Sequence, residues 1–182
     1  ADGKAALRTR KGLDWTEKFS GIAKAGAALG DCILDGEVCA VDKNGTPDFS
    51  ALQAALSDGK TGRLILFAFD LLFAGGEDLR PLPLSERKRR LAGLLKTLKG
   101  KPRDIIRYVD HLETDGAAVL ESACRMTLEG IISKELDAPY RSGRGHGWIK
   151  SKCRGGHEVV IGGWWGDRTT LRSLLVGVRR GK

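Results

Sequence analysis

The stretch RLILFAFDLLF, residues 63–73, is an apolar and aromatic run in which Asp70 is the one charged interruption after Arg63. Aromatic and branched aliphatic residues are enriched in β-strands, where they pack well on a pleated surface. A strand that is apolar along almost its whole length is typical of the centre of a sheet. We therefore predict that residues 63–73 form the central strand of the fold.

Shorter segments on either side of this run predict further strands. Residues 31–42, DCILDGEVCAVD, are followed by Asn44-Gly45, a dipeptide typical of tight turns. At the start of the chain, Asp2-Gly3 predicts a hairpin turn that leads into a strand. That first strand would run through Ala6, Arg8 and Arg10, and the remaining ones would lie near residues 105–109, 128–135, 148–153, 157–165 and 171–180.

Four segments predict helices. Asp14 and Glu17 resemble a capping box that opens the first helix. Ser50 and Gln53 predict the start of a short helix over residues 50–57, and Ser85 opens the third. A fourth helix is predicted around residues 117–126. The apolar positions at helical spacing are Trp15, Phe19, Ile22 and Ala23 in the first helix, and Leu91, Leu94, Leu95 and Leu98 in the third.

Helices and strands alternate, but the strands are too varied and too rich in turns for a doubly wound parallel sheet. We therefore predict an α+β fold of mainly antiparallel sheets with flanking helices. With 182 residues, 41% of them hydrophobic and 30% charged, the chain suits one globular domain and part of a second. No apolar run approaches the length of a membrane span, so we expect no membrane partner.

The chain has four cysteines, Cys32, Cys39, Cys124 and Cys153. None of them forms a C-x-x-C pair, and no histidine lies near them at the spacing of a zinc finger. Cysteines without such a pattern are usually reduced and buried in cytosolic proteins. We therefore predict free thiols rather than a metal site or a disulfide framework.

The net charge of +8 comes from one end of the chain. Residues 1–140 carry 21 basic and 21 acidic side chains, whereas residues 141–182 carry ten basic and two acidic ones. Clustered cations favour binding to a polyanion, because neutralising phosphates dominates non-specific affinity for nucleic acids. The alternative is a solvated basic surface without a partner.

The segment WIKSKC, residues 148–153, carries two lysines separated by one residue. In a strand, Lys150 and Lys152 lie on one face because successive side chains alternate. Their like charges repel each other, so the arrangement favours an anionic partner such as a triphosphate. The alternative is a pair of solvated lysines on an edge strand, which discourage aggregation.

Three acidic positions and one aromatic position are further candidates for ligand binding. Glu129, at the start of an apolar strand, suits a Mg²⁺ site or is a solvated strand end. Asp35 and Glu37 share a strand face around Gly36, and they suit acid–base hydrolysis, metal binding or hydrogen bonds from a ribose. Phe69 belongs either to the core or to a platform on which a base stacks.

The order and spacing of these motifs carry more information than any motif alone. The succession TRKG (9–12), LDGE (34–37), FAFDLL (67–72), LEGIISK (128–134) and WIKSK (148–152) resembles the motif series of the covalent nucleotidyltransferases. This superfamily contains ATP-dependent DNA ligases, RNA ligases and capping enzymes. The phrases TRKGLDWTEKF, FSALQAAL and LRPLPLSERKRRL resemble bacterial ATP-dependent ligases, especially the ligase domain of the end-joining ligase D. The resemblance covers nearly the whole chain.

The resemblance implies an enzyme that forms a lysyl-AMP from ATP and passes the AMP to a 5′-phosphate at a DNA nick. Attack by the 3′-hydroxyl then seals the strand. For the matching residues it implies a ribose contact by Glu37 and adenine stacking by Phe69. It further implies that Glu129 binds Mg²⁺ or Mn²⁺ and that Lys150 and Lys152 contact the α-phosphate of ATP or AMP. Arg10 would contact the phosphate of nicked DNA. Further phosphate contacts are implied for Arg141, Arg144 and Lys134.

One part of the family pattern is missing. The nucleophilic lysine of the family lies in a K-x-D-G motif upstream of TRKG, and no such motif occurs in the sequence. Asp2-Gly3 lies too close to Arg10 to be its tail, so we expect the chain alone not to adenylate itself. We expect residues 1–154 to form an adenylation (nucleotidyltransferase) domain without its N-terminal segment. Residues 157–182 resemble the first strands of an OB-fold domain.

We therefore expect an ATP-dependent DNA ligase of DNA repair and end joining, in the bacterial cytoplasm and associated with the nucleoid. Its expected partners are nicked or broken double-stranded DNA, and end-joining proteins or fused polymerase and nuclease domains. One alternative is an RNA ligase or capping-type nucleotidyltransferase, against which the phrases DWTEKF and FSALQAAL speak. The other is a non-catalytic nucleic-acid-binding remnant, against which the retained Glu37, Glu129, Lys150 and Lys152 speak.

Overall fold

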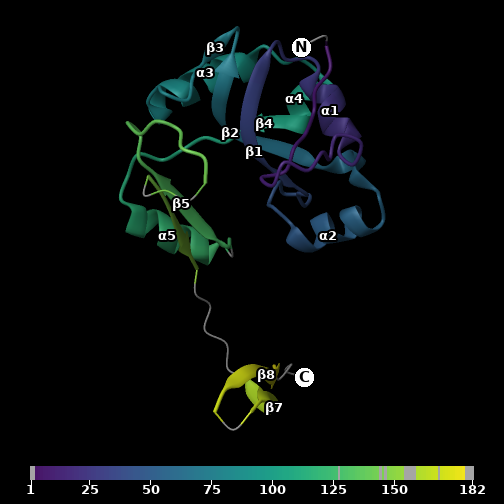
Figure 1. The fold of residues 1–182 in the computed structure, drawn as a ribbon, viewed down its shortest axis with the longest axis vertical. Coiled ribbons are helices and arrows are strands. Elements are labelled where there is room, and N and C mark those ends of the chain that lie inside the picture. The colour runs from purple at the N-terminus through teal and green to yellow at the C-terminus, as the bar shows by residue number, and fades with distance from the viewer. Residues whose placement is uncertain are drawn as a thin grey trace. The chain divides into compact units, whose positions relative to one another are not determined.

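The computed structural model of the chain describes residues 3–126, 128–143, 145, 147–153, 159–167 and 169–178 (Figure 1). The chain divides into two compact units. The first consists of Ala1–Glu113 and Lys134–Ile149, and the second of Thr114–Ser133 and Lys150–Lys182. The mixture of helices and mainly antiparallel strands confirms the predicted α+β fold. The domain boundary predicted between residues 154 and 157 lies outside the described residues.

The first unit is built on a four-stranded sheet whose central strand is β2, Ile65–Ala74. Strands β1 (Cys32–Cys39) and β3 (Glu77–Asp78) pair with β2 in antiparallel orientation. Strand β4 (Ile106–Tyr108) pairs with β2 in parallel orientation. The predicted central strand is therefore confirmed, and so are the strands predicted near β1 and β4.

Strand β2 carries one residue more than β1 at the position of Phe69. Gly36 of β1 lies opposite Ala68 and Asp35 lies opposite Asp70, so Phe69 faces no residue of β1 in the register of the pair. An extra residue of this kind is a β-bulge, which bends the strand and redirects its side chains. The regular alternation of β2 is therefore interrupted at Phe69.

Glycine is required at two positions, one within β1 and one in the turn that follows it. A Cβ at Gly36 would lie 2.8 Å from the carbonyl oxygen of Phe67, closer than real contacts allow. Gly45, in the turn that follows β1, has a φ of +83°, which glycine adopts without strain. The turn predicted at Asn44-Gly45 is therefore confirmed.

Helices accompany the sheet of the first unit (Figure 1). Helix α3 (Leu84–Lys96) packs on β2 and confirms the helix predicted from Ser85. Helices α1 (Ser20–Gly26) and α4 (Lys101–Ile105) pack against each other. Helix α2 (Phe49–Ser57) lies between β1 and β2 in the sequence, and the 3₁₀ helix η1 (Thr61–Arg63) precedes β2. The short elements α4, η1 and β3 are not among the predicted ones.

Two of the predicted helix starts are wrong. The Asp14 carboxylate accepts a hydrogen bond from the backbone N–H of Thr16 (2.9 Å) within a turn, and α1 begins only at Ser20. Helix α2 is capped by Asp48 rather than Ser50, because the Asp48 carboxylate accepts a hydrogen bond from a backbone N–H of the first turn (2.9 Å). A carboxylate before a helix also interacts favourably with the helix dipole, which a serine hydroxyl does not.

The strand predicted through Ala6, Arg8 and Arg10 does not form in the described part of the chain. The segment makes one isolated antiparallel bridge, between Arg8 and Asp14. A tight turn closes it, and Gly12 in this turn has a φ of +80°. The backbone N–H groups of Thr9, Gly12 and Trp15 donate to carbonyl oxygens within this loop, so they are not available to a neighbouring strand.

Two apolar clusters form the core of the first unit. The larger one joins side chains from α1, β2, α3 and β4, and it contains the predicted helical positions Leu91 and Leu95. Leu98 is also buried in it, but the prediction that Leu98 belongs to the helix is wrong, because α3 ends at Lys96. The smaller one contains Phe19 and Ile22 around α1, with Ala40 and Leu64. The other buried members of the larger cluster are Ala25, Leu29, Ala68, Leu71, Leu79 and Ile106.

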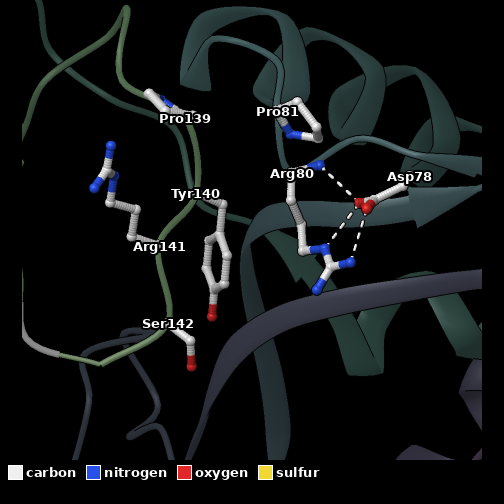
Figure 2. Close-up of a pocket in the computed structure, with 7 residues that line it drawn as sticks. All are labelled: Asp78, Arg80, Pro81, Pro139, Tyr140, Arg141 and Ser142. Carbon is white, nitrogen blue, oxygen red and sulfur yellow. Dashed lines mark hydrogen bonds and ion pairs between the residues drawn. The ribbon is translucent and has the colours of Figure 1, made fainter.

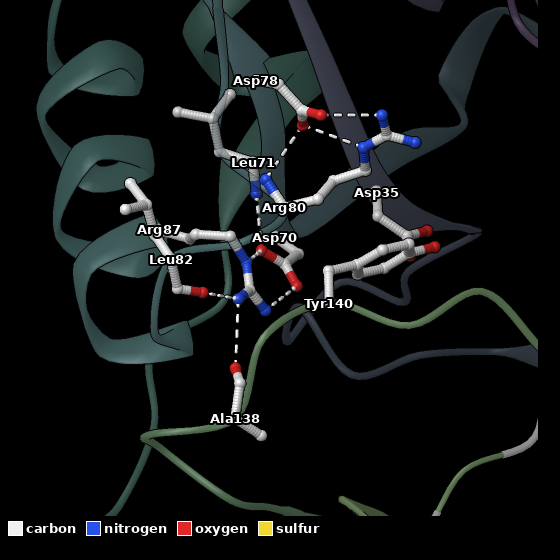
Figure 3. A network of polar contacts seen from close by, with 9 residues as sticks. All are labelled: Asp35, Asp70, Leu71, Asp78, Arg80, Leu82, Arg87, Ala138 and Tyr140. Atoms are coloured by element: carbon white, nitrogen blue, oxygen red, sulfur yellow. Dashed lines mark hydrogen bonds and ion pairs between the residues drawn. The ribbon is translucent and has the colours of Figure 1, made fainter.

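Asp70, the one charge within the central strand, is fully buried and pairs with Arg87 of α3 (Figure 3). The guanidinium donates from Nε to Oδ1 of Asp70 (2.8 Å) and from Nη2 to Oδ2 (2.9 Å). Its Nη1 donates to the carbonyl oxygens of Leu82 and Ala138. Buried ions are tolerated when they are both paired and fully hydrogen-bonded. The Asp70–Arg87 pair therefore connects β2, α3 and the segment before Tyr140 by hydrogen bonds.

The second unit contains helix α5 (Gly116–Arg125), which confirms the helix predicted around residues 117–126. Strand β5 (Gly130–Lys134) pairs with β6 (Trp148–Lys152), and both strands continue into the first unit at one end. Strands β7 (Val160–Gly166) and β8 (Leu171–Gly177) pair in antiparallel orientation. No described helix of the chain is long and apolar enough to cross a membrane.

A disulfide bond joins Cys124 of α5 to Cys153, which follows β6. The prediction of free thiols is therefore wrong for this pair, and it holds for Cys32 and Cys39. The two bonded cysteines are 29 residues apart and meet only through the folding of the second unit, so their spacing gave no signal. Ala123 is the one buried side chain among the described residues of this unit, and the bond supplements a small apolar core.

Replacing Asp70 with asparagine should strongly destabilise the protein, because it leaves the Arg87 guanidinium buried without its counter-ion. Removing one partner of a buried pair typically costs about 3–5 kcal/mol. We expect urea denaturation to give a loss of that order in the free energy of unfolding. Asp78→Asn is the matched control, since the Asp78–Arg80 pair (2.7 Å) is exposed and such pairs contribute about 0–1 kcal/mol. Equal losses for the two variants would contradict the role of the buried pair.

Candidate functional site

Lys134, at the end of β5, directs its ammonium group at two aromatic rings of the first unit. Its Nζ lies 4.0 Å from the ring centroid of Phe69 and 3.7 Å from that of Trp148. The two rings meet edge to face, with 5.7 Å between their centroids. A cation beside aromatic rings is attracted by their quadrupoles. Phe69, Lys134 and Trp148 together form the aromatic–lysine cluster.

The environment of this cluster shifts the pKa values of two ionisable groups. Burial lowers the pKa of Lys134 to about 8, because the charged form loses hydration, and the charges of Asp70 and Asp35 offset part of that effect. Burial, and after it the charge of Asp70, raises the pKa of Asp35 above its ordinary value. Amines and carboxylates that are shifted in this way are concentrated at functional sites.

Tyr140 links Asp35 to the buried ion pair (Figure 3). Its hydroxyl donates a long hydrogen bond to Oδ2 of Asp35 (3.4 Å). Its backbone N–H donates to the carbonyl oxygen of Arg80 (2.8 Å), and the guanidinium carbon of Arg87 lies 6.0 Å from its ring centroid. Burial raises the pKa of the Tyr140 phenol, so the hydroxyl is protonated and able to donate at neutral pH. The buried pair thus helps to hold the tyrosine that orients Asp35.

Tyr140 also lines a surface pocket of the first unit (Figure 2). Within it, Asp78 holds Arg80 through two hydrogen bonds of 2.8 Å and 2.7 Å. Arg141 is exposed and forms no ion pair with the residues that the structure describes. Its guanidinium is therefore open to an anion such as a phosphate. The pocket is lined by Asp78, Arg80, Pro81, Pro139, Tyr140, Arg141 and Ser142.

Glu129, Lys150 and Lys152 form the acid–lysine cluster, which belongs to the second unit. The Nζ atoms of Lys150 and Lys152 lie 2.9 Å and 3.0 Å from the same carboxylate oxygen, Oε1 of Glu129. The two lysines therefore share a strand face, as predicted. Their hydrogen bonds hold the pKa of Glu129 below its ordinary value, so the carboxylate is ionised. Because all three side chains are more than half exposed, a ligand has access to them.

The backbone fixes Glu129 beside the end of β6. The N–H of Cys153 donates to the carbonyl oxygen of Glu129 (2.9 Å). Gly130, the next residue, has a φ of +150°, and a Cβ there would overlap the carbonyl oxygen of Ser151. Glycine is therefore required at this position, since any side chain would force β5 and β6 apart.

The other predicted site residues lie at the surface or outside the described residues. Glu37 is exposed on β1, opposite Phe67. Arg10 is exposed in the loop closed by the bridge between Arg8 and Asp14. Arg144 lies outside the described residues.

Sequence reasoning missed four residues that shape the site. Trp148 is the first residue of WIKSKC, and an aromatic side chain beside a charged motif is the signal that could have identified it. Tyr140 stands in the segment APYRSGR without a comparable signal. The Asp70–Arg87 pair has no local signal either, because the two residues are 17 apart and meet only when α3 packs on β2.

Residues 1–152 match the sequence profile of a family described as "ATP dependent DNA ligase domain". The chain belongs to this family. It is 42% identical over 182 residues to the multifunctional non-homologous end joining protein LigD of Pseudomonas aeruginosa, a match that covers 97% of the chain and 21% of that protein. It is 33% identical over 183 residues to the protein of the same name from Mycobacterium bovis, covering 97% and 23%. The chain thus spans less than a quarter of either relative.

Solved structures lead to the same family. A mycobacterial DNA ligase D complexed with ATP and MES is similar with a TM-score of 0.73 and 32% identity, covering 97% of this chain and 56% of that one. The ligase domain of M. tuberculosis LigD is similar with a TM-score of 0.69 and 31% identity, covering 99% and 58%. The family and the nucleotidyltransferase fold expected from the motif series are therefore confirmed.

The lowered pKa of Lys134 predicts how the stability of the protein changes with pH. Between the folded pKa of about 8 and the ordinary value of 10.5, the unfolded chain keeps a proton that the folded chain has lost. The free energy of unfolding therefore contains a component that rises with pH across this window. Urea denaturation gives the free energy of unfolding of the wild type and of Lys134→Met at each pH. The value for the wild type minus the value for the variant is the contribution of Lys134. This difference should grow as the pH is raised, and a constant difference would contradict the assignment.

Proposed function

We propose that the chain is the nucleotide-handling part of an ATP-dependent DNA ligase that acts in the repair of broken DNA. Membership in the ligase-domain family supports this proposal. The observation that carries it is the acid–lysine cluster, in which one ionised carboxylate and two lysines lie together on exposed strands. Fixed charges of this kind suit a site where negative charge develops on phosphorus.

In the proposed mechanism, residues of the first unit bind the nucleoside. Phe69 stacks on adenine, and the bulge at this residue turns its ring out of the regular alternation of β2. Glu37, exposed on β1, accepts a hydrogen bond from a ribose hydroxyl. Lys134 lies beside the same ring of Phe69, so its amine is available to a nucleotide that stacks there.

Residues of the second unit bind the phosphate. Lys150 and Lys152 stabilise charge on the α-phosphate, and their geometry is set before the nucleotide arrives because both are held by Glu129. Charges that are already in place need no reorganisation in the transition state. Each ammonium group has three N–H donors, so both lysines can donate to phosphate oxygens while they stay bonded to Glu129.

A divalent cation fits the acid–lysine cluster only together with the nucleotide. Among the described residues, no group of three His, Cys, Asp or Glu side chains could hold a metal ion by itself. Mg²⁺ is commonly held by one or two carboxylates, with phosphate oxygens and water as the other ligands. Glu129 would supply such a carboxylate for Mg²⁺ or Mn²⁺, and the ion would neutralise phosphate charge.

The lysyl-AMP step needs a nucleophile that the 182 residues do not contain as a K-x-D-G motif. We propose that the residues present here act on the phosphate in that step and in the later joining of the strands. In the joining step, the 3′-hydroxyl forms a bond with the 5′-phosphorus and AMP leaves. This last step requires no enzyme lysine as a nucleophile.

A nicked duplex that already carries AMP on its 5′-phosphate tests the proposal independently of the nucleophile. We expect the chain to join this substrate with Mg²⁺ and not to join an ordinary nick with ATP. Lys150→Ala and Glu129→Gln should each lower the joining rate by about 100-fold or more, the usual loss when one preorganised charge is removed. Denaturing electrophoresis of a labelled strand measures the product.

The matched control is Lys99→Ala, which removes an exposed lysine outside both clusters and should leave the joining rate unchanged. Wild-type rates in Lys150→Ala and Glu129→Gln would contradict the role of the acid–lysine cluster. Failure of the unmodified chain to join the adenylated nick would contradict the proposed activity of these residues.

We further propose that nicked or broken double-stranded DNA is the substrate of the whole protein. Arg10 and Arg141 are exposed cations of the first unit and suit contacts with DNA phosphates. Arg144 is assigned the same role on its resemblance alone. The relatives are named multifunctional non-homologous end joining proteins, which supports end-joining partners. Fused polymerase and nuclease domains, and action at the nucleoid in the bacterial cytoplasm, are assigned on the resemblance alone.

A further inference from the structure

The disulfide bond between Cys124 and Cys153 connects the two segments of the chain that carry the acid–lysine cluster. On one side, Cys153 directly follows β6, and its N–H is bonded to the carbonyl oxygen of Glu129 (2.9 Å). On the other side, Cys124 lies in α5, and the N–H of Leu128 is bonded to the carbonyl oxygen of Ala123 (3.0 Å). The bond thus ties the strand end that carries the lysines to the segment that leads into Glu129.

Little apolar burial stabilises α5 and its surroundings in the described part of the second unit. Ala123 is its one buried side chain among the described residues, and α5 has ten residues. Isolated helices of that length are only marginally stable in water, so the stability of α5 depends on its bonds and contacts with the rest of the chain. A cross-link over a sequence separation of 29 restricts the unfolded chain and so stabilises the folded one. Loss of the bond is therefore expected to loosen α5 and the start of β5.

Cys124 and Cys153 are half-buried rather than enclosed, so small oxidants and thiols can reach them. A peroxide supplies the oxidation: the thiolate of one cysteine attacks the O–O bond, forms a sulfenic acid and releases hydroxide. The second thiol then displaces the sulfenic oxygen as water while the S–S bond forms. The two thiols lose two electrons and two protons, and one peroxide becomes two waters. A small dithiol reverses the reaction by exchange and is itself oxidised to a disulfide.

We propose that Cys124 and Cys153 form a reversible thiol–disulfide site that controls phosphate binding by the acid–lysine cluster. With the bond formed, Glu129, Lys150 and Lys152 keep one geometry and bind a polyphosphate. With the bond reduced, these three side chains adopt the binding geometry only part of the time, and polyphosphate binding is weaker. The effect on phosphate binding rests on the proposed function, whereas the redox site itself does not.

The first test counts thiols. Peroxide-treated protein is denatured and alkylated with iodoacetamide, and the expected product carries two adducts, on Cys32 and Cys39. After reduction with dithiothreitol, all four cysteines should be alkylated. Peptide mapping of the oxidised form should recover Cys124 linked to Cys153. Four adducts on the oxidised protein, or a different linked pair, would overturn the proposal.

The second test measures the affinity for inorganic tripolyphosphate by calorimetry. If only about a tenth of the reduced protein keeps the binding geometry, its affinity is lower about tenfold than that of the oxidised protein. Cys124→Ser/Cys153→Ser should bind as the reduced wild type does and should not respond to dithiothreitol. Cys32→Ser/Cys39→Ser is the matched control, because it keeps the bonded pair and should keep the full response.

Equal affinities of the oxidised and reduced forms would overturn the control of phosphate binding. If neither form binds tripolyphosphate, the phosphate role within the proposed function fails, and hydrogen exchange decides the redox site separately. Amide exchange in α5 should be faster after reduction of the wild type and unaffected by reductant in Cys124→Ser/Cys153→Ser. Equal exchange in both forms of the wild type would overturn the site.

Discussion

The ion pair between Asp70 and Arg87 is the interaction on which the first unit depends. A carboxylate in the central strand is costly to bury unless each of its oxygens is bonded, and Arg87 satisfies both. The same guanidinium bonds the carbonyl oxygen of Ala138 and so holds the segment that carries Tyr140. Asp70 also follows the bulged Phe69 directly. The interaction that stabilises the sheet therefore also fixes the surroundings of the aromatic–lysine cluster.

The two clusters, each within its own unit, differ in their physical character. The aromatic–lysine cluster is half-buried and offers two aromatic rings, and burial lowers the pKa of its lysine, Lys134. The acid–lysine cluster is exposed and is built from a carboxylate and two amines, the side-chain types that interact with divalent cations and with phosphate.

The strands and the larger helices could be predicted from sequence because their signals are local. The apolar run of β2, the alternation around β1 and the leucine spacing of α3 each lie within one element. The lysine pair of β6 was equally readable from strand periodicity. What failed depended on contacts between distant residues or on competition between neighbours. Asp48 rather than Ser50 caps α2, and the Cys124–Cys153 bond requires the folded second unit.

We propose that Phe69 binds the base of ATP while Lys150 and Lys152 bind its phosphates. Calorimetric titration of the wild type, Phe69→Ala and Lys150→Ala with ATP and with inorganic tripolyphosphate tests it directly. Stacking of one base contributes about 1–3 kcal/mol, so Phe69→Ala should bind ATP about tenfold more weakly and tripolyphosphate as well as the wild type does. Lys150→Ala should weaken both ligands. The account is contradicted if Phe69→Ala binds ATP like the wild type, or loses affinity for both ligands equally.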